Sequence, residues 1–253
     1  MKARTITFFG GDAKVGTTML AQCVAEVLAQ RGEKVLLIFA SSEKYDGFIP
    51  DAEGTGLGLD YIIGFSPKHE DIERITNNNG LINYIKGANK IAQVKKFSPY
   101  CLTEVKSLAV DSYDYILIDG GHNYQYPLPC SALLAGDRRY YVMEGCNRSL
   151  DRLSDTLDNI VSAMANKKNA KLKVHIENQS GDKIILNKYD RAKVAVTSDI
   201  VEGKFKKKVL TVPLAANGYA AETNNKTLYM APGVTKAFQT AINAIADDIE
   251  GLV

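Results

Sequence analysis

The sequence predicts an α/β protein whose doubly wound, mostly parallel sheet carries helices on both faces. Three short apolar runs have the composition of buried strands, namely "TITFF" (5–9), "KVLLIF" (34–39) and "YDYILIDGG" (113–121). Amphipathic helical patterns lie between such runs. Parallel neighbours need crossover connections, so strands that alternate with helices predict a parallel sheet covered on both sides.

The first 39 residues form a predicted βαβ unit. After the strand at 5–9, "TTMLAQCVAEVLAQRG" places Leu20, Val24 and Leu28 on one helical stripe, and Gly32 ends the helix. The run at 34–39 then supplies the second strand. This unit sets a glycine-containing loop at the first strand-to-helix turn.

The pattern from Ala40 to about Pro99 is weaker. There "EGTGLGLDYIIGFSP" suggests a glycine-rich loop and a short helix, and "NNNGLINYIKG" suggests a turn and a strand. Beyond it, "CLTEVKSLAVDS" has Leu102, Val105 and Leu108 at helical spacing and leads into the strand at 113–121.

The second half continues the alternation. Strands are predicted at 138–143, 183–187 and 207–214. Two amphipathic helices are expected, with apolar stripes at Leu150, Leu153, Leu157, Ile160 and Met164 and at Phe238, Ile242, Ile245 and Ile249. Because no internal repeat, low-complexity segment or linker interrupts the pattern, we expect a single domain over residues 1–253.

Composition is that of an ordinary soluble chain. The chain has 31 lysines and arginines against 29 aspartates and glutamates. The resulting net charge of +2 does not indicate a nucleic-acid or membrane partner. The four cysteines form no CxxC pair and the three histidines are dispersed, so neither a disulfide framework nor a zinc site is expected. No apolar stretch is long enough to span a membrane, and we expect a cytoplasmic protein.

The loop "GGDAKVGTTML" has the outline of a phosphate-binding loop. Gly11 and Gly16 match the glycine spacing of G-x-x-x-x-G-K-[ST], in which the lysine reaches the outer phosphates and the hydroxyl binds Mg²⁺. Here Thr17 replaces that lysine, Thr18 stands at the magnesium position, and Lys14 lies inside the loop. Backbone N–H groups at a helix start, reinforced by the helix dipole, attract phosphate.

An acidic residue on a neighbouring strand would complete such a site. Asp119 closes "YDYILID" and is well placed to hold a magnesium-bound water. Simpler interpretations stay open: the glycines could form a mere tight turn, Asp119 could cap the next helix, and Lys14 could be a solvated loop lysine. The basic run at 203–209 is most simply a solvated strand entrance.

The order of these motifs resembles the MinD/ParA family of deviant P-loop ATPases over nearly the whole chain. "GEKVLLIFASSE", "SYDYILIDGG", "IILNKYD" and "VLTVPLAANGYAAE" are similar to the family's second strand, its Walker B strand, its adenine-reading strand and the segment that closes over the base. The resemblance implies ATP or ADP with Mg²⁺, bound by Gly11, Lys14, Val15, Gly16, Thr17, Thr18, Asn187, Pro213 and Leu214. It implies Thr18 and Asp119 as the metal-binding residues.

Within that family, a threonine in place of the loop lysine resembles the CpaE/TadZ branch, which helps to position pilus or secretion machinery. Three charged groups associated with hydrolysis are absent: Asp12 aligns with the family's signature lysine, Thr17 with the ordinary loop lysine, and 39–42 with a strand that normally ends in aspartate. Losing one preorganised donor typically costs about 10²–10³ in rate. We therefore expect nucleotide binding with slow or absent hydrolysis.

Other functions stay open. The chain could be an active partition-type ATPase that uses Lys14, a nucleotide-free interaction scaffold, or, with less support from the surrounding residues, an iron–sulfur ATPase with Cys130 at a dimer axis. The terminal "ADDIEGLV" is acidic, so anionic lipid should repel this helix, which is expected to pack on the sheet instead. The resemblance implies a homodimer and a protein partner that could recruit it to the membrane; nucleic acid is not indicated.

Overall fold

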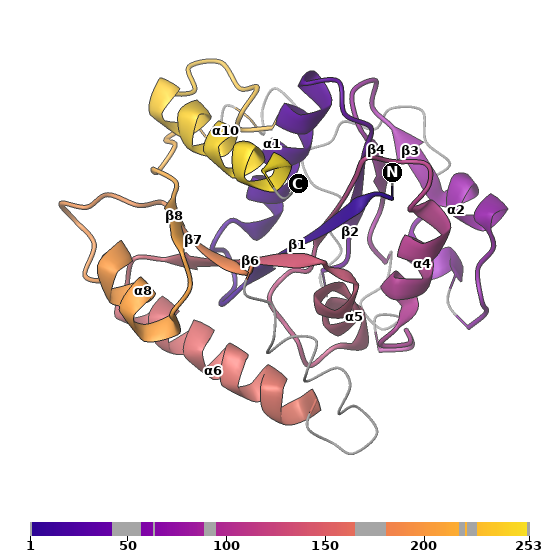
Figure 1. Cartoon of the computed structure of the whole chain (residues 1–253), viewed down its shortest axis with the longest axis horizontal. Coiled ribbons are helices and arrows are strands. Elements are labelled where there is room, and N and C mark those ends of the chain that lie inside the picture. The colour runs from indigo at the N-terminus through magenta and orange to yellow at the C-terminus, as the bar shows by residue number, and fades with distance from the viewer. Residues whose placement is uncertain are drawn as a thin grey trace.

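A computed structural model describes residues 2–41, 57–62, 64–88, 95–164, 181–217, 221 and 227–251, with the side chains of 161–164 left out. Within this part of the chain, eight strands form one sheet in the order β3-β4-β2-β5-β1-β6-β7-β8 (Figure 1). The strands are β1 (Arg4–Gly10), β2 (Val35–Phe39), β3 (Thr76–Asn78), β4 (Asn83–Ile85), β5 (Tyr115–Asp119), β6 (Arg138–Glu144), β7 (Lys183–Asn187) and β8 (Val209–Thr211). All neighbours pair in parallel except β3 and β4. The predicted doubly wound sheet is confirmed.

Helices cover both faces of this sheet (Figure 1). They are α1 (Thr17–Gln30), η1 (Leu59–Ile62), α2 (His69–Ile75), α4 (Cys101–Ala109), α5 (Pro127–Ala135), α6 (Asn147–Met164), α8 (Ser198–Phe205) and α10 (Lys236–Glu250). Helices α1 and α10 share one hydrophobic core with the sheet. On the other face, η1, α2, α4 and α5 build a second core, while α5, α6 and α8 build a third.

The buried strands explain why their sequences are continuously apolar. In β2, Leu37 packs into the core under α1, whereas Leu36 and Ile38 pack into the core of the opposite face. All five residues of β2 and all five of β5 are buried. A strand with helices on both sides has no solvent-facing row, so the usual alternation of polar and apolar residues disappears.

The segment "NNNGLINYIKG" contains the expected turn and strand β4, and the structure adds the unpredicted β3, which pairs antiparallel with β4. The expected short helix in "GLDYII" is η1. Residues 53–56 and 63 of the predicted glycine-rich stretch lie outside the described residues. Helices α2, α5 and α8 were not predicted. Helix α5, "PLPCSALLA", is buried almost all round and therefore has no polar stripe to mark it.

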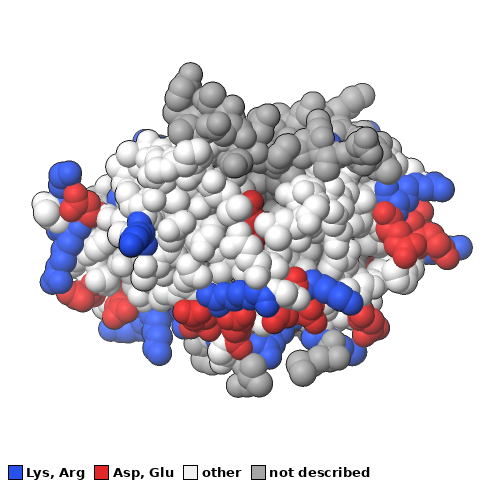
Figure 2. Space-filling model, turned by 90° about the horizontal axis from the view of Figure 1, so that it is seen from above, with Lys and Arg blue, Asp and Glu red and all other residues white. Residues whose placement is uncertain are grey.

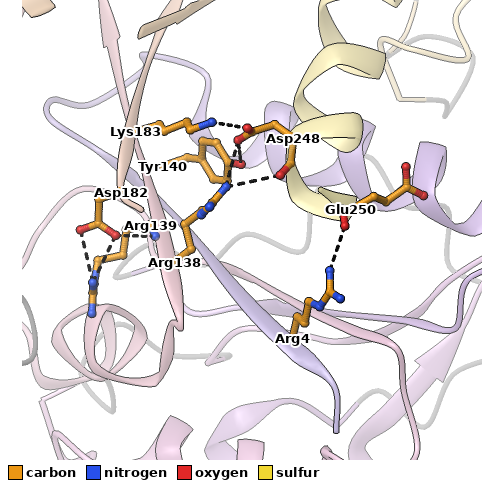
Figure 3. A network of polar contacts seen from close by, with 8 residues as sticks. All are labelled: Arg4, Arg138, Arg139, Tyr140, Asp182, Lys183, Asp248 and Glu250. Carbon is orange, nitrogen blue, oxygen red and sulfur yellow. Dashed lines mark hydrogen bonds and ion pairs between the residues drawn. The ribbon is translucent and has the colours of Figure 1, made fainter. Parts of the chain in front are cut away.

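The C-terminal helix packs on the sheet as the acidic sequence suggested. Asp248 accepts hydrogen bonds from Tyr140 and from Arg138, at 3.1 Å, and pairs with Lys183 (Figure 3). Burial by itself would raise the pKa of Asp248, but these partners outweigh it and hold the pKa below its ordinary value. Asp248 of α10 is thus neutralised at the amino ends of β6 and β7, whereas Asp247 and Glu250 of the same helix pair with Arg31.

A second ion pair lies inside the protein beside the first one. Arg139 and Asp182 are 0% and 3% exposed, and Arg139 Nη1 lies 3.3 Å from both carboxylate oxygens (Figure 3). Arg139 also donates to the carbonyl oxygens of Leu133 and Gly136. The pair ties β6 to the approach to β7 and to the end of α5.

No helix in the described ranges is long and apolar enough to cross a bilayer.

Candidate functional site

The loop between β1 and α1 is fixed at the carboxyl edge of the sheet. The N–H of Gly10 donates to the carbonyl oxygen of Gly121 at 2.7 Å, and the N–H of Gly11 donates to that of Val142 at 2.9 Å. These bonds tie the start of the loop to the segment that follows β5 and to β6 itself, the two neighbours of β1. The loop therefore stands where the strand order reverses, which is the usual ligand position in such sheets.

Gly16 takes a conformation that favours glycine and leaves no room for a side chain. Its φ is 92°, and a Cβ there would lie 2.3 Å from Nδ2 of Asn187. That nitrogen donates to the carbonyl oxygen of Val15 at 2.8 Å. Asn187, which the resemblance assigned to base recognition, thus also braces the loop from the end of β7.

Thr18 and Asp119, the two predicted metal-site residues, are in contact. The Thr18 hydroxyl donates to Asp119 Oδ2 at 2.6 Å, and the Gly121 N–H donates to Oδ1 at 3.1 Å. Complete burial raises the pKa of Asp119, while these two hydrogen bonds and the charge of His122 offset part of that rise. A cation beside the carboxylate would offset the remaining cost of burying its charge.

This donor set suits magnesium. Magnesium keeps several waters and is usually held by one or two carboxylates together with substrate phosphates. The described residues contain no group of three His, Cys, Asp or Glu side chains that could hold a metal alone. One hydroxyl beside one carboxylate, at a phosphate-type loop, is what a nucleotide-dependent Mg²⁺ site requires.

Two adjoining cavities open at the loop. The larger, about 400 Å³, is called the polar cavity below because charged and hydroxyl side chains are among its lining residues, which are Asp12, Ala13, Lys14, Gly16, Thr17, Thr18, Met19, Ser41, Gly121 and His122. The smaller, about 180 Å³, is mostly apolar and is lined by Gly16, Met19, Leu20, Asn187, Lys188, Pro213, Leu214, Ala215, Leu228 and Phe238. Gly16 and Met19 border both cavities. A polar chamber joined to an apolar one has the shape and chemistry for a phosphate chain and a flat base.

The structure brings together most of the residues predicted for the site. Lys14, Gly16, Thr17 and Thr18 line the larger cavity, and Asn187, Pro213 and Leu214 line the smaller one. Gly11 and Val15 line neither. A Cβ on Gly11 would lie 2.8 Å from Leu153 of α6, and Val15 packs into the core, so both shape the loop from behind.

Thr17, at the position of the family's loop lysine, and Lys14, inside the loop, differ in how exposed their side chains are. Thr17 is only 7% exposed, and its hydroxyl lies 2.6 Å from where a Cβ on Gly10 would be, so it faces the base of the loop. The Lys14 side chain is exposed, with φ of 61°, while its carbonyl oxygen accepts a 2.9 Å hydrogen bond from Lys188 Nζ. Lys188 also pairs with Glu144 at 2.5 Å and so links the loop to β6.

Asp12 has partners that the sequence did not reveal. Its Oδ1 accepts the N–H of Ala13 at 2.8 Å, and its Oδ2 lies 3.3 Å from Nε of Arg148 in the first turn of α6. Sequence reasoning missed Arg148, because nothing in the spacing from 12 to 148 marks the contact. It also missed His122 and Ser41, which line the polar cavity after β5 and β2.

The fold of this chain is similar to that of several solved structures. No family model matches the chain, and no curated protein matches it. Among solved structures, the cell division ATPase MinD of Pyrococcus furiosus is 20% identical, with a TM-score of 0.75 over 99% of this chain and 100% of that one. The septum site-determining protein MinD of Pyrococcus horikoshii, complexed with Mg-ADP, is 18% identical, with a TM-score of 0.76 over 99% and 97% of the two chains. A ParA family ATPase of Chlorobium tepidum is 17% identical, with a TM-score of 0.73 over 96% and 98%.

At these identities the likeness concerns the fold. The chain has the P-loop NTPase-like α/β fold of the MinD and ParA ATPases, along almost its full length.

Proposed function

We propose that the protein is a nucleotide-binding switch that takes ATP or ADP with Mg²⁺ and hydrolyses ATP slowly or not at all. One observation carries the proposal: the Thr18 hydroxyl, which lines the larger cavity, is joined at 2.6 Å to the fully buried Asp119, and this cavity shares Gly16 and Met19 with the smaller, apolar one. Mg-ADP in the Pyrococcus horikoshii MinD structure supports the same ligand class.

Binding would divide between the two cavities. Backbone N–H groups around Gly16 and the Thr18 hydroxyl would hold the phosphate chain, with Asp119 fixing a metal-bound water. Pro213 and Leu214 would cover the base; Leu214 is 61% exposed and has apolar surface to lose. The magnesium ion would supply charge neutralisation between the phosphates.

Slow hydrolysis follows from the charges around the cavity. Phosphoryl transfer depends on positioning and on positive charge at the transferred group. Thr17 faces the base of the loop, and Asp12 brings a negative charge to the cavity. After β2, the cavity wall has Ser41 in place of a carboxylate that could orient the attacking water. The described wall of the cavity therefore holds one exposed lysine, Lys14, to stabilise a developing charge.

The finer role is a regulatory or localisation factor of the CpaE/TadZ type, acting as a homodimer with a protein partner in a membrane-associated or partition machinery. We place it in the cytoplasm, with any membrane contact made through the partner. On the face drawn in Figure 2 most of the described Lys and Arg side chains lie beside Asp and Glu, so this face has no broad basic patch of the kind that nucleic acid would need. Light scattering of the protein with and without ATP tests the dimer, and a mass that never changes would contradict it.

The central test is calorimetric titration with ATP and ADP, with and without Mg²⁺. We expect micromolar binding that Mg²⁺ strengthens, and that Thr18→Ala or Asp119→Asn weakens by about tenfold or more, since the first removes the proposed metal ligand and the second the charge that holds its water. Thr103→Ala, an exposed threonine of α4, is the matched control and should bind as the parent does. Unchanged binding in both site variants would refute the assignment.

Two other outcomes select the other functions. Measurable ATP turnover that needs both Lys14 and Asp119 would make the protein a working partition-type ATPase. No heat at millimolar nucleotide would make it a scaffold. A Lys14→Ala variant that binds ATP as tightly as the parent would show that Lys14 does not replace the lost loop lysine.

A further inference from the structure

Beside a residue of the polar cavity lies a guanidinium that the loop motif does not include. Arg148 Nε lies 3.3 Å from Asp12 Oδ2, and Asp12 lines the cavity. The Arg148 side chain is 76% exposed, so most of the guanidinium faces solvent beside the opening.

Asp12 occupies one edge of the guanidinium and leaves the other edge available. The contact with Asp12 is made through Nε of Arg148, and Asp12 is its ion-pair partner among the described residues. The two terminal nitrogens, Nη1 and Nη2, form the donor pair that grips phosphate oxygens in a fork. The carboxylate partner therefore orients the arginine through Nε and leaves its two terminal nitrogens available for a ligand.

Helix α6 fixes the base of this side chain against the loop. Leu153 packs closely against the loop, because a Cβ on Gly11 would lie only 2.8 Å from the Leu153 side chain. The Thr156 hydroxyl lies 3.5 Å from the Gly11 carbonyl oxygen. At the start of the helix, the Ser149 hydroxyl accepts the N–H of Glu144 at 3.0 Å. Arg148 thus projects from a helix that is packed on the loop itself.

We propose that Arg148 is a phosphate-binding residue that takes the terminal phosphate of a bound nucleoside triphosphate, with Asp12 as the residue that positions it. Asp12 alone would repel a triphosphate, but by holding Arg148 it helps to bring a positive charge to the phosphate site. The inference rests on the proposed function, because it needs a nucleotide in the loop. It makes the site discriminate by the number of phosphates, since only a triphosphate has the terminal phosphate that Arg148 would take.

The test is calorimetric titration with Mg-ATP, Mg-ADP and inorganic phosphate. We expect Arg148→Ala to lower ATP affinity by about tenfold or more, as for loss of one charge-assisted hydrogen bond, and ADP affinity by less than about threefold. Arg148→Lys should recover only part of the ATP affinity because lysine lacks the fork. The matched control is Arg152→Ala, an exposed arginine one turn further along α6, which should bind both nucleotides as the parent does.

A second variant separates direct contact from simple neutralisation of Asp12. If Arg148 only cancels the aspartate, Arg148→Ala should cost nothing in an Asp12→Asn background. If it binds phosphate, the selective loss of ATP affinity persists there. Equal losses for ATP and ADP, or a loss that vanishes in the Asp12→Asn background, would overturn the inference while leaving nucleotide binding in place. A parent protein that binds neither nucleotide would overturn both proposals.

Discussion

Glu26 is a carboxylic acid buried in helix α1, and it gives the protein a distinctive dependence of stability on pH. The residue is 6% exposed, and its carboxylate accepts a hydrogen bond from the hydroxyl of Thr227, which is 3% exposed. Burial raises the pKa of Glu26 from 4.5 to about 7, and the Thr227 hydrogen bond opposes that rise. The fully buried thiol of Cys23 lies nearby, and its pKa is also raised, by burial first and by Glu26 second.

The direction of the effect follows from proton binding. The folded protein holds the Glu26 proton up to about pH 7, whereas the unfolded chain releases it near 4.5. Stability from this group is therefore fully present below about pH 4.5 and is lost as the pH rises towards 7. One pKa unit corresponds to about 1.4 kcal/mol, so the loss amounts to about 3 kcal/mol.

Glu26→Gln removes the titrating group and keeps a neutral side chain of the same shape beside Thr227. We expect the variant to match the parent near pH 4.5 and to exceed its free energy of unfolding by about 3 kcal/mol near pH 8. Urea unfolding followed by far-UV circular dichroism, at a series of pH values, measures this difference.

The difference between variant and parent isolates Glu26 from other titrating groups, including Asp119. Glu70→Gln, an exposed glutamate in the first turn of α2, is the control and should show a nearly constant difference across the same range. A Glu26→Gln difference that stays flat between about pH 5 and pH 8 would refute the reasoning, because it would mean that the buried carboxylate is not protonated in the folded state.

Three further predictions concern the ion pairs and the loop. Asp182→Ala should lower the free energy of unfolding by about 3–5 kcal/mol, since it leaves Arg139 buried without its charge partner; a urea midpoint close to that of the parent would contradict this. Asp248→Ala removes an acceptor shared by three donors at the amino ends of β6 and β7 and should cost about 1.5–3 kcal/mol; an unchanged Tm would show that α10 is held by its apolar face alone. Gly16→Ala places a Cβ 2.3 Å from Asn187 Nδ2 at a φ of 92°, so we expect about 1–3 kcal/mol of strain and a loss of nucleotide binding; titration that matches the parent would argue against the braced loop.

Sequence reasoning worked best where one local pattern decides one element. Strand β7 occupies Lys183–Asn187, the range predicted from "KIILN", and β5 ends at Asp119 as expected. The amphipathic stripe of α6 places Leu153 and Ile160 in the core. Periodicity captured these elements because burial on one or two faces imposes it directly on neighbouring residues.

It failed where burial removes the pattern or the element is short. Helix α5 is apolar on nearly every side because α4 and the sheet both cover it, and α2 and α8 are too short for a clear period. The ends of strands also shifted, as in β8, which occupies Val209–Thr211 within the predicted 207–214. A strand ends where its pairing partner ends, which depends on residues elsewhere in the chain.

By itself, the sequence determined the α/β class and the loop at the first strand-to-helix turn, and it predicted the residues that we propose for phosphate and magnesium. Those follow from local spacing and from side-chain chemistry. Only the tertiary structure decided that Asp12 holds Arg148, that Asn187 braces Val15, and that Thr18 meets Asp119 across 101 positions of the chain. Such contacts join side chains from separate strands and helices, and their distances are set by how the whole sheet packs, which no single stretch of sequence encodes.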